Sequence, residues 1–229
     1  MTMILITGAN RGIGLALAQN ASKRGWSVIG TARDPGKADK LKNIPGVRVE
    51  RLDADSDDSC KALANSLAGS PIDILINNAG ISPDKSKNLE SFDPEAYMAC
   101  LRTNSVGPLL VTRALLPNIE ASGRKLVVQI SSIMGSLTNA ADQNWKGNLA
   151  YHSSKSALNM ANILIANSLK EKGIACVAIH PGWVQTDMGG PNAHLTPDAS
   201  AASILDTVEK LSVKDAGAYL NYDGKPLPW

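Results

Sequence analysis

Short runs of β-branched and apolar residues alternate with longer helix-like stretches along the chain, and this alternation constrains the fold more than any other feature. The runs at 3–7, 73–77, 125–130 and 175–180 are almost continuously apolar. Such runs are typical of strands that are buried on both faces of a parallel sheet. Three weaker runs, at 27–31, 47–50 and 218–221, are also predicted to be strands. The full set of predicted strands is 3–7, 27–31, 47–50, 73–77, 125–130, 175–180 and 218–221.

Helices are predicted between these strands, at 12–24, 56–68, 94–118, 149–171 and 196–211. Asp93 and Pro94 suit the cap and first turn of one helix, and Thr196 or Asp198 suits the cap of the last. Repeated strand–helix–strand units with right-handed crossovers predict an α/β fold with one doubly wound, Rossmann-type parallel sheet of about seven strands. No repeat or linker interrupts the pattern, so residues 1–229 are expected to form a single domain.

Composition excludes several classes of protein. Of the 229 residues, 44% are apolar and 19% charged, which is typical of a soluble globular protein. The net charge is +2 and there is no basic tract, so neither nucleic acid nor a membrane surface is an expected partner. There is no signal peptide and no apolar stretch of about 18 residues, so the expected location is cytoplasmic. Cys60, Cys100 and Cys176 lack metal-ligand spacing, so no metal site is expected.

A glycine-rich stretch, "TGANRGIG" at 7–14, lies between the first predicted strand and the first predicted helix. Gly8, Gly12 and Gly14 permit a tight turn, close approach of a pyrophosphate and close helix–strand packing. The helix N-terminus offers free N–H donors to phosphates. The alternative is a turn that binds no ligand, and the strand–turn–helix context disfavours it.

The stretch "AYHSSK" places Tyr151 four residues before Lys155, so both side chains lie on one face of a predicted helix. Alone, a Tyr-x-x-x-Lys pattern is weak, since chance gives one in roughly a quarter of chains of this composition. The other motifs decide its meaning. They are Asp53 after the third strand, "NNAG" at 77–80, Asn104, "SS" at 131–132 and "PGWVQT" at 181–186.

Taken in order, these motifs resemble those of the short-chain dehydrogenase/reductase family, whose first turn reads T-G-x-x-x-G-x-G. The resemblance covers essentially the whole chain. It implies hydride transfer with a nicotinamide cofactor and a catalytic set of Asn104, Ser132, Tyr151 and Lys155. The implied cofactor-binding residues are Gly8, Asn10, Arg11, Gly12, Ile13, Gly14, Arg33, Asp53, Ala54, Asn78, Ala79, Gly80, Tyr151, Lys155, Pro181, Gly182, Val184 and Thr186.

The end of the second strand bears on the choice of cofactor. The family position for an acid that binds the ribose 2′-OH of NAD is occupied by Ala32. Arg33 and Arg11 instead suit the 2′-phosphate of NADP(H), which is the predicted cofactor. The alternative is that both arginines are solvated surface residues, and Asp34 is expected to weaken the preference.

Reduction of a carbonyl builds negative charge on oxygen, and Tyr151 is expected to supply the proton. A neighbouring Lys155 is expected to lower the tyrosine pKa, and a shift of about 3 units needs roughly 4 kcal/mol. Ser132 is expected to bind the same oxygen. The resemblance gives Asn104 a water that links Lys155 to solvent, and the alternative for Asn104 is a helix kink beside Gly107 and Pro108. His152, His180 and His194 are expected to be structural.

The substrate is less well specified. An extra segment at 139–148, with Trp145, is expected to wall the pocket, and a short covering loop at 187–195 indicates loose selectivity. This segment and the ending "NYDGKPLPW" resemble the C-factor and sniffer-type carbonyl reductases, which implies reduction of aldehydes, ketones or quinones. A dinucleotide-binding signalling protein and an NAD-dependent alcohol dehydrogenase remain as alternatives. A homodimer through 94–118 and 149–171 is expected.

Overall fold

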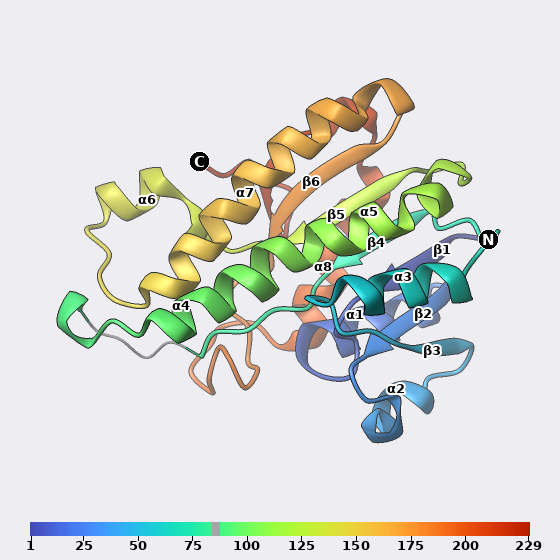
Figure 1. Ribbon diagram of the computed structural model, residues 1–229, viewed down its shortest axis with the longest axis horizontal. Helices are drawn as coiled ribbons and strands as arrows, with labels where there is room; N and C mark the ends of the chain where they lie inside the picture. The colour runs from blue at the N-terminus through green and yellow to red at the C-terminus, as the bar shows by residue number, and fades with distance from the viewer. Residues whose placement is uncertain (84–87) are drawn as a thin grey trace.

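Parallel strands form one sheet in the computed structural model of the chain, which describes residues 1–83 and 88–229 (Figure 1). In the described residues the sheet has seven strands in the order β3-β2-β1-β4-β5-β6-β7. Every neighbouring pair is parallel, which confirms the predicted doubly wound α/β fold. The strands are β1 (Met3–Ile6), β2 (Ser27–Ala32), β3 (Val47–Arg51), β4 (Ile74–Asn77), β5 (Leu126–Ile130), β6 (Ala175–His180) and β7 (Tyr219–Asn221).

The helices cover both faces of this sheet. They are α1 (Gly12–Lys23), α2 (Asp39–Lys42), α3 (Asp57–Ser66), α4 (Pro94–Leu101), α5 (Gly107–Glu120), α6 (Leu137–Asp142), α7 (Leu149–Leu169) and α8 (Pro197–Lys210). Helices α1 and α8 pack on one face, and α3, α5 and α7 pack on the other. Figure 1 shows α4 and α7 extending side by side beyond the sheet, with α6 near their outer end.

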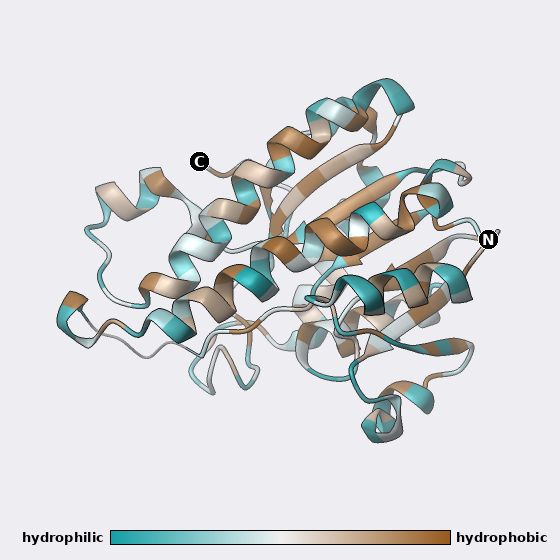
Figure 2. Ribbon diagram, viewed as in Figure 1, coloured by the Kyte–Doolittle hydropathy of each residue, from teal (hydrophilic) through white to brown (hydrophobic). Residues whose placement is uncertain are grey.

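A hydrophobic core lies on each face of the sheet, and successive side chains of each central strand point alternately into one core and the other. In β1, Ile4 and Ile6 face α1 and α8, whereas Leu5 faces the opposite layer with Leu75 of β4. All four of these side chains are fully buried. The strands are therefore apolar on both faces, as the continuous runs predicted, and Figure 2 shows the hydrophobic colour concentrated on the central strands.

Helix ends follow local capping chemistry. The carboxylate of Asp93 accepts hydrogen bonds from the N–H groups of Glu95 and Ala96, and Pro94 is the first residue of α4. Thr196 caps α8 through the N–H of Ala199. Asp198, the alternative cap, instead accepts a hydrogen bond from Asn20 of α1.

Two details of the predicted helices were wrong. The helix expected at 94–118 is not uniform, because a π-helical turn at Arg102–Val106 separates α4 from α5. Two short helices, α2 and α6, were not predicted, since neither is long enough to show a helical repeat in its apolar residues. Within 1–83 and 88–229, no helix is long and apolar enough to cross a membrane.

Candidate active site

The loops that follow β1 and β4 meet where the strand order reverses, which is where doubly wound folds bind ligands. Thr7 ties the two loops together, because its Oγ1 accepts hydrogen bonds from the N–H of Asn78 at 2.9 Å and of Ala79 at 3.0 Å. The Asn78 amide returns two bonds, to the carbonyls of Thr7 at 2.9 Å and of Gly8 at 3.1 Å. The "NNAG" segment thus fixes the shape of the glycine-rich turn.

The glycine-rich turn forms a cradle that side chains would fill. Gly8 and Gly12 have φ values of +63° and +55°, which favour glycine. A Cβ on Gly14 would lie 2.3 Å from the Gly8 carbonyl oxygen and 2.5 Å from Nδ2 of Asn78. Arg11 precedes α1 and makes no side-chain cap among the described residues, so the first N–H groups of the helix have no acceptor from it; Asn10 and Ile13 flank this start in the sequence. These features fit the pyrophosphate of a dinucleotide.

The loop after β6 closes the other side of this cradle. A Cβ on Gly12 would lie 3.4 Å from the Cγ2 of Thr186, so Thr186 reaches the glycine-rich turn. Gly182, with φ of +83°, packs tightly under Leu195, whose side chain a Cβ there would approach to 2.4 Å. Pro181 and Val184 are buried. Residues 187–195 form a short closed loop, because the backbone N–H of Gln185 bonds the carbonyl of Leu195 at 2.9 Å.

The predicted adenosine-binding residues gather at the ends of β2 and β3. Arg33 is exposed directly after β2, and Asp53 and Ala54 follow β3. Burial and the neighbouring Asp55 raise the pKa of Asp53, and the positive charge of Arg33 opposes that shift. Arg11 lies elsewhere, since its guanidinium pairs with Asp187 of the loop after β6 at 2.8 Å. The two arginines predicted to bind the 2′-phosphate therefore have different partners: Arg11 pairs with Asp187, whereas Arg33 lies near Asp53.

Ser132, Tyr151 and Lys155 come together beside the cradle, as the sequence predicted. Ser132 is the second residue after β5, and its side chain is close enough to Tyr151 to influence the pKa of the tyrosine. Tyr151 and Lys155 lie one turn apart in α7, with the Lys155 Nζ 5.6 Å from the centre of the tyrosine ring. Lys155 is buried and its Nζ donates to the carbonyl of Ile130 at 2.8 Å.

The expected net lowering of the Tyr151 pKa is wrong for the protein alone. Burial raises the pKa of Tyr151 to about 12, and the nearby Ser132 side chain only partly opposes this. Burial also lowers the pKa of Lys155 to about 8. Both shifts have the same cause, because a low-dielectric environment disfavours the charged form of either group. At neutral pH the tyrosine is therefore protonated.

Asn104 lies in the π-helical turn and is fully buried. Its Nδ2 donates to the Ile81 carbonyl at 2.8 Å and to the Ser154 hydroxyl at 3.0 Å, and its Oδ1 accepts from the Ile81 N–H at 2.8 Å. A Cβ on Gly80 would lie 3.2 Å from that Oδ1 and 3.8 Å from the Lys155 Nζ. The Asn104 side chain thus holds the Gly80–Ile81 segment against the buried lysine.

Sequence reasoning missed several residues that shape this site. Thr7 opens the glycine-rich motif, so its position in that motif was an available signal. Tyr219 donates to the main-chain oxygen of Ser132, a contact that has no local sequence signal because 87 positions separate the two residues. In the segment expected to wall the pocket, Trp145 packs edge-on against His152, with ring centres 5.6 Å apart.

The described residues contain no group of three or more His, Cys, Asp or Glu arranged to hold a metal ion.

Comparisons with known proteins agree with this geometry. Residues 2–195 match the model of the short chain dehydrogenase family. The C-signal protein of Myxococcus xanthus is 38% identical over 74% of this chain and 99% of its own length. The structure of carbonyl reductase Sniffer of D. melanogaster has a TM-score of 0.92 at 34% identity, and covers 100% of both chains.

An NADPH-bound carbonyl reductase from chicken fatty liver has a TM-score of 0.91 at 34% identity, covering 100% of this chain and 99% of its own. Both solved structures are similar to this chain along its whole length. The family match, the relatives and the geometry of the cradle agree, and the chain belongs to the short chain dehydrogenase family of NAD(P)-dependent oxidoreductases.

Proposed function

We propose that this protein reduces a small carbonyl compound, an aldehyde, ketone or quinone, to the alcohol with NADPH. The observation that supports this most is the meeting of Ser132, Tyr151 and Lys155 beside the dinucleotide cradle. The similarity to two carbonyl reductases over the full chain supports the same substrate class.

The protonation state of Tyr151 favours the reductive direction. A tyrosine with a pKa of about 12 carries its proton at neutral pH and acts as a donor, whereas alcohol oxidation needs it as a base. NADPH, when bound, supplies the hydride to the carbonyl carbon. Tyr151 gives its proton to the carbonyl oxygen as negative charge develops there, and the Ser132 hydroxyl binds the same oxygen.

Lys155 acts after the proton has left Tyr151. With a pKa of about 8, its ammonium group is mostly charged at pH 7 and stabilises the phenolate that proton donation produces. Asn104 keeps the Gly80–Ile81 segment packed beside this ammonium. We propose that a water held near Asn104 returns a proton from solvent to the pair.

NADPH rather than NADH is proposed because Ala32 leaves no acid at the end of β2 and Arg33 is exposed there. A guanidinium suits the dianionic 2′-phosphate, which NADH lacks. Arg11 is a less direct contributor, because its pairing with Asp187 must be broken or shared before it contacts a phosphate.

Replacing Tyr151 with Phe tests the proposed chemistry. The variant keeps the ring but removes the proton, so single-turnover reduction of a reactive aldehyde or quinone at saturating NADPH should slow by at least about 10²–10⁴-fold. NADPH affinity, measured by fluorescence, should stay within about twofold, because the phosphates bind elsewhere. Tyr97→Phe on α4 makes the same chemical change outside the site and serves as the control. A Tyr151→Phe enzyme that retained more than about a tenth of the rate would exclude general-acid catalysis by this residue.

The C-signal relative favours a second function, signalling by a dinucleotide-bound form with incidental catalysis. A panel of aldehydes, diketones and quinones separates the two functions. The signalling alternative predicts tight NADPH binding without nicotinamide oxidation by any member of the panel. Alcohol oxidation with NAD⁺, measured in the same assay, tests the oxidative alternative.

We propose that the protein forms a homodimer through α5 and α7. An apolar groove lies between these helices, lined by Leu109, Leu110, Leu116, Ile165 and Leu169. Met160 and Leu164 of α7 are also exposed, at 58% and 60%, and would add apolar area to such an interface. Light scattering should give twice the chain mass of 24.1 kDa, and a mass that stays at one chain up to high concentration would reject the dimer.

A further inference from the structure

Tyr219, the first residue of β7, contacts the main chain of Ser132, the candidate catalytic serine. Its hydroxyl donates to the main-chain oxygen of Ser132 at 2.5 Å, and the tyrosine is 3% exposed. Burial raises the pKa of Tyr219 to about 12, opposed in part by the nearby Asn159 side chain, so the hydroxyl remains a donor at physiological pH. A carbonyl oxygen can only accept, so this bond depends on the tyrosine proton.

The turn that carries Ser132 is anchored at two further points. Asn159 of α7 accepts a hydrogen bond from the Ser131 hydroxyl at 2.6 Å and donates to the Gly135 carbonyl at 3.1 Å. Gly135 presses on α7, because a Cβ there would lie 2.8 Å from the carbonyl carbon of Lys155. Tyr219 supplies a further anchor, which acts on the Ser132 carbonyl together with the Gly135 N–H, a donor at 2.8 Å.

Trp229 extends this support to the wall of the pocket. Its ring stacks on that of Tyr219, with centres 5.0 Å apart and planes at 26°. Its main-chain oxygen accepts hydrogen bonds from the Thr138 N–H at 2.8 Å and from the Ser136 hydroxyl at 3.3 Å. Ser136 caps α6, so one residue links the start of α6 to Tyr219.

We infer that Tyr219 is a positioning residue for Ser132 in carbonyl reduction, and that Trp229 holds both Tyr219 and the start of α6 in place. The inference rests on the proposed function. Without the tyrosine hydroxyl the Ser132 carbonyl keeps its bond from the Gly135 N–H at 2.8 Å but loses the shorter one, so the Ser132 peptide can tilt and its side chain loses its alignment with the substrate oxygen and with Tyr151. Cofactor binding should not be affected, because the glycine-rich turn follows β1, and β4, β5 and β6 lie between β1 and β7.

A double-mutant cycle between Tyr219→Phe and Ser132→Ala tests the inference. Tyr219→Phe keeps the stacking on Trp229 and removes only the donor. Its single-turnover rate should fall about tenfold, since small misplacements of reacting groups cost one to two orders of magnitude. In the Ser132→Ala background, the same substitution should lower the rate by less than about twofold, because there is no serine hydroxyl left to position. NADPH affinity should stay within about twofold throughout.

The outcomes separate the two proposals. A wild-type enzyme that reduces no carbonyl of the panel rejects the proposed function, and the role of Tyr219 with it. If the wild type is active and Tyr219→Phe lowers the rate equally in both backgrounds, the tyrosine is only structural and the inference is overturned. A rate unchanged by Tyr219→Phe overturns it as well. Tyr97→Phe, the matched control, should leave the rate and the affinity unchanged.

Thermal unfolding of each variant confirms that it is folded at the assay temperature. Should Tyr219→Phe not fold, Trp229→Leu takes its place in the cycle. That variant keeps the tyrosine hydroxyl and removes the ring that holds it. It should show the same lack of additivity with Ser132→Ala and, in addition, a raised KM, because the main-chain oxygen that binds Thr138 and Ser136 is no longer held in place by the stacked ring. Full additivity with an unchanged KM would overturn the inference.

Discussion

At the end of β2, Arg33 is exposed and close enough to Asp53 for its charge to influence that carboxyl group. Arg33→Ala should weaken NADPH binding by about 1–3 kcal/mol, the scale for losing a charge-assisted hydrogen bond, and leave NADH binding almost unchanged. Fluorescence titration with both cofactors measures this difference. Arg48→Ala, which removes an exposed arginine paired with Glu50 on β3, is the control. Equal losses for NADPH and NADH would contradict a 2′-phosphate role.

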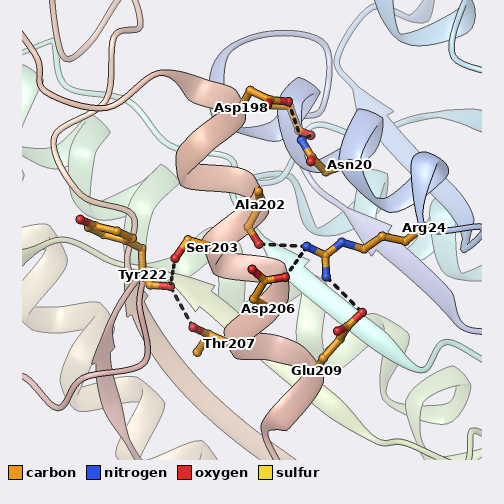
Figure 3. Close-up of polar contacts among 10 residues, drawn as sticks. Asn20, Arg24, Asp198, Ala202, Ser203, Asp206, Thr207, Glu209 and Tyr222 are labelled. Atoms are coloured by element: carbon orange, nitrogen blue, oxygen red, sulfur yellow. Dashed lines mark hydrogen bonds and ion pairs between the residues drawn. The ribbon is translucent and has the colours of Figure 1, made fainter.

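Among the elements, α1 and α8 are joined by a cluster of polar contacts (Figure 3). Arg24, at the end of α1, bonds the Ala202 carbonyl at 3.1 Å and pairs with Asp206 at 2.6 Å and Glu209 at 3.1 Å. The Arg24 side chain is only 22% exposed, so the cation that binds these partners is largely shielded from water. Because α1 starts at the phosphate cradle and α8 follows the loop after β6, this cluster also braces the two sides of the cofactor site.

Arg24→Ala should lower the free energy of unfolding by about 1–3 kcal/mol, since it leaves two carboxylates and a carbonyl without their donor. Urea unfolding measures the change. Lys23→Ala removes a neighbouring cation whose pair with Asp198 spans 3.8 Å and is exposed on both sides, so its loss should be under about 1 kcal/mol. Equal losses in the two variants would show that the Arg24 cluster adds no more than a surface ion pair.

For the whole molecule, a buried histidine makes stability depend on pH. His180 ends β6, its Nδ1 has no hydrogen-bond partner within the described residues, and burial lowers its pKa from 6.5 to about 4. Between these values the unfolded chain binds a proton that the folded protein does not. The free energy of unfolding should therefore fall by up to about 3 kcal/mol as the pH drops from 6.5 to 4.

Comparison with His180→Gln isolates this contribution from that of the carboxylates, which also destabilise the protein in acid. The difference in unfolding free energy between wild type and variant should change steadily from pH 6.5 to 4. A difference that is independent of pH would exclude His180 as the cause. The exposed His194, changed to Gln, is the control. We propose that residues 1–229 form one domain, which predicts a single cooperative transition in these experiments.

Local chemistry determined much of this protein. Continuous apolar runs predicted buried parallel strands, because both faces of such strands meet helices, and Asp93 and Pro94 predicted the start of α4. The spacing of Gly8, Gly12 and Gly14 predicted the tight turn between β1 and α1, since glycine tolerates its backbone angles and close approaches. The i,i+4 spacing of Tyr151 and Lys155 likewise placed both on one face of α7.

Other properties were decided only by the tertiary structure. The Tyr151 pKa is raised rather than lowered, because burial depends on everything that packs around α7 and no spacing encodes it. Arg11 pairs with Asp187, 176 positions away, and Tyr219 bonds Ser132, 87 positions away. Short sequence patterns report neighbours along the chain, whereas these contacts exist because the sheet brings the ends of separate strands to one edge.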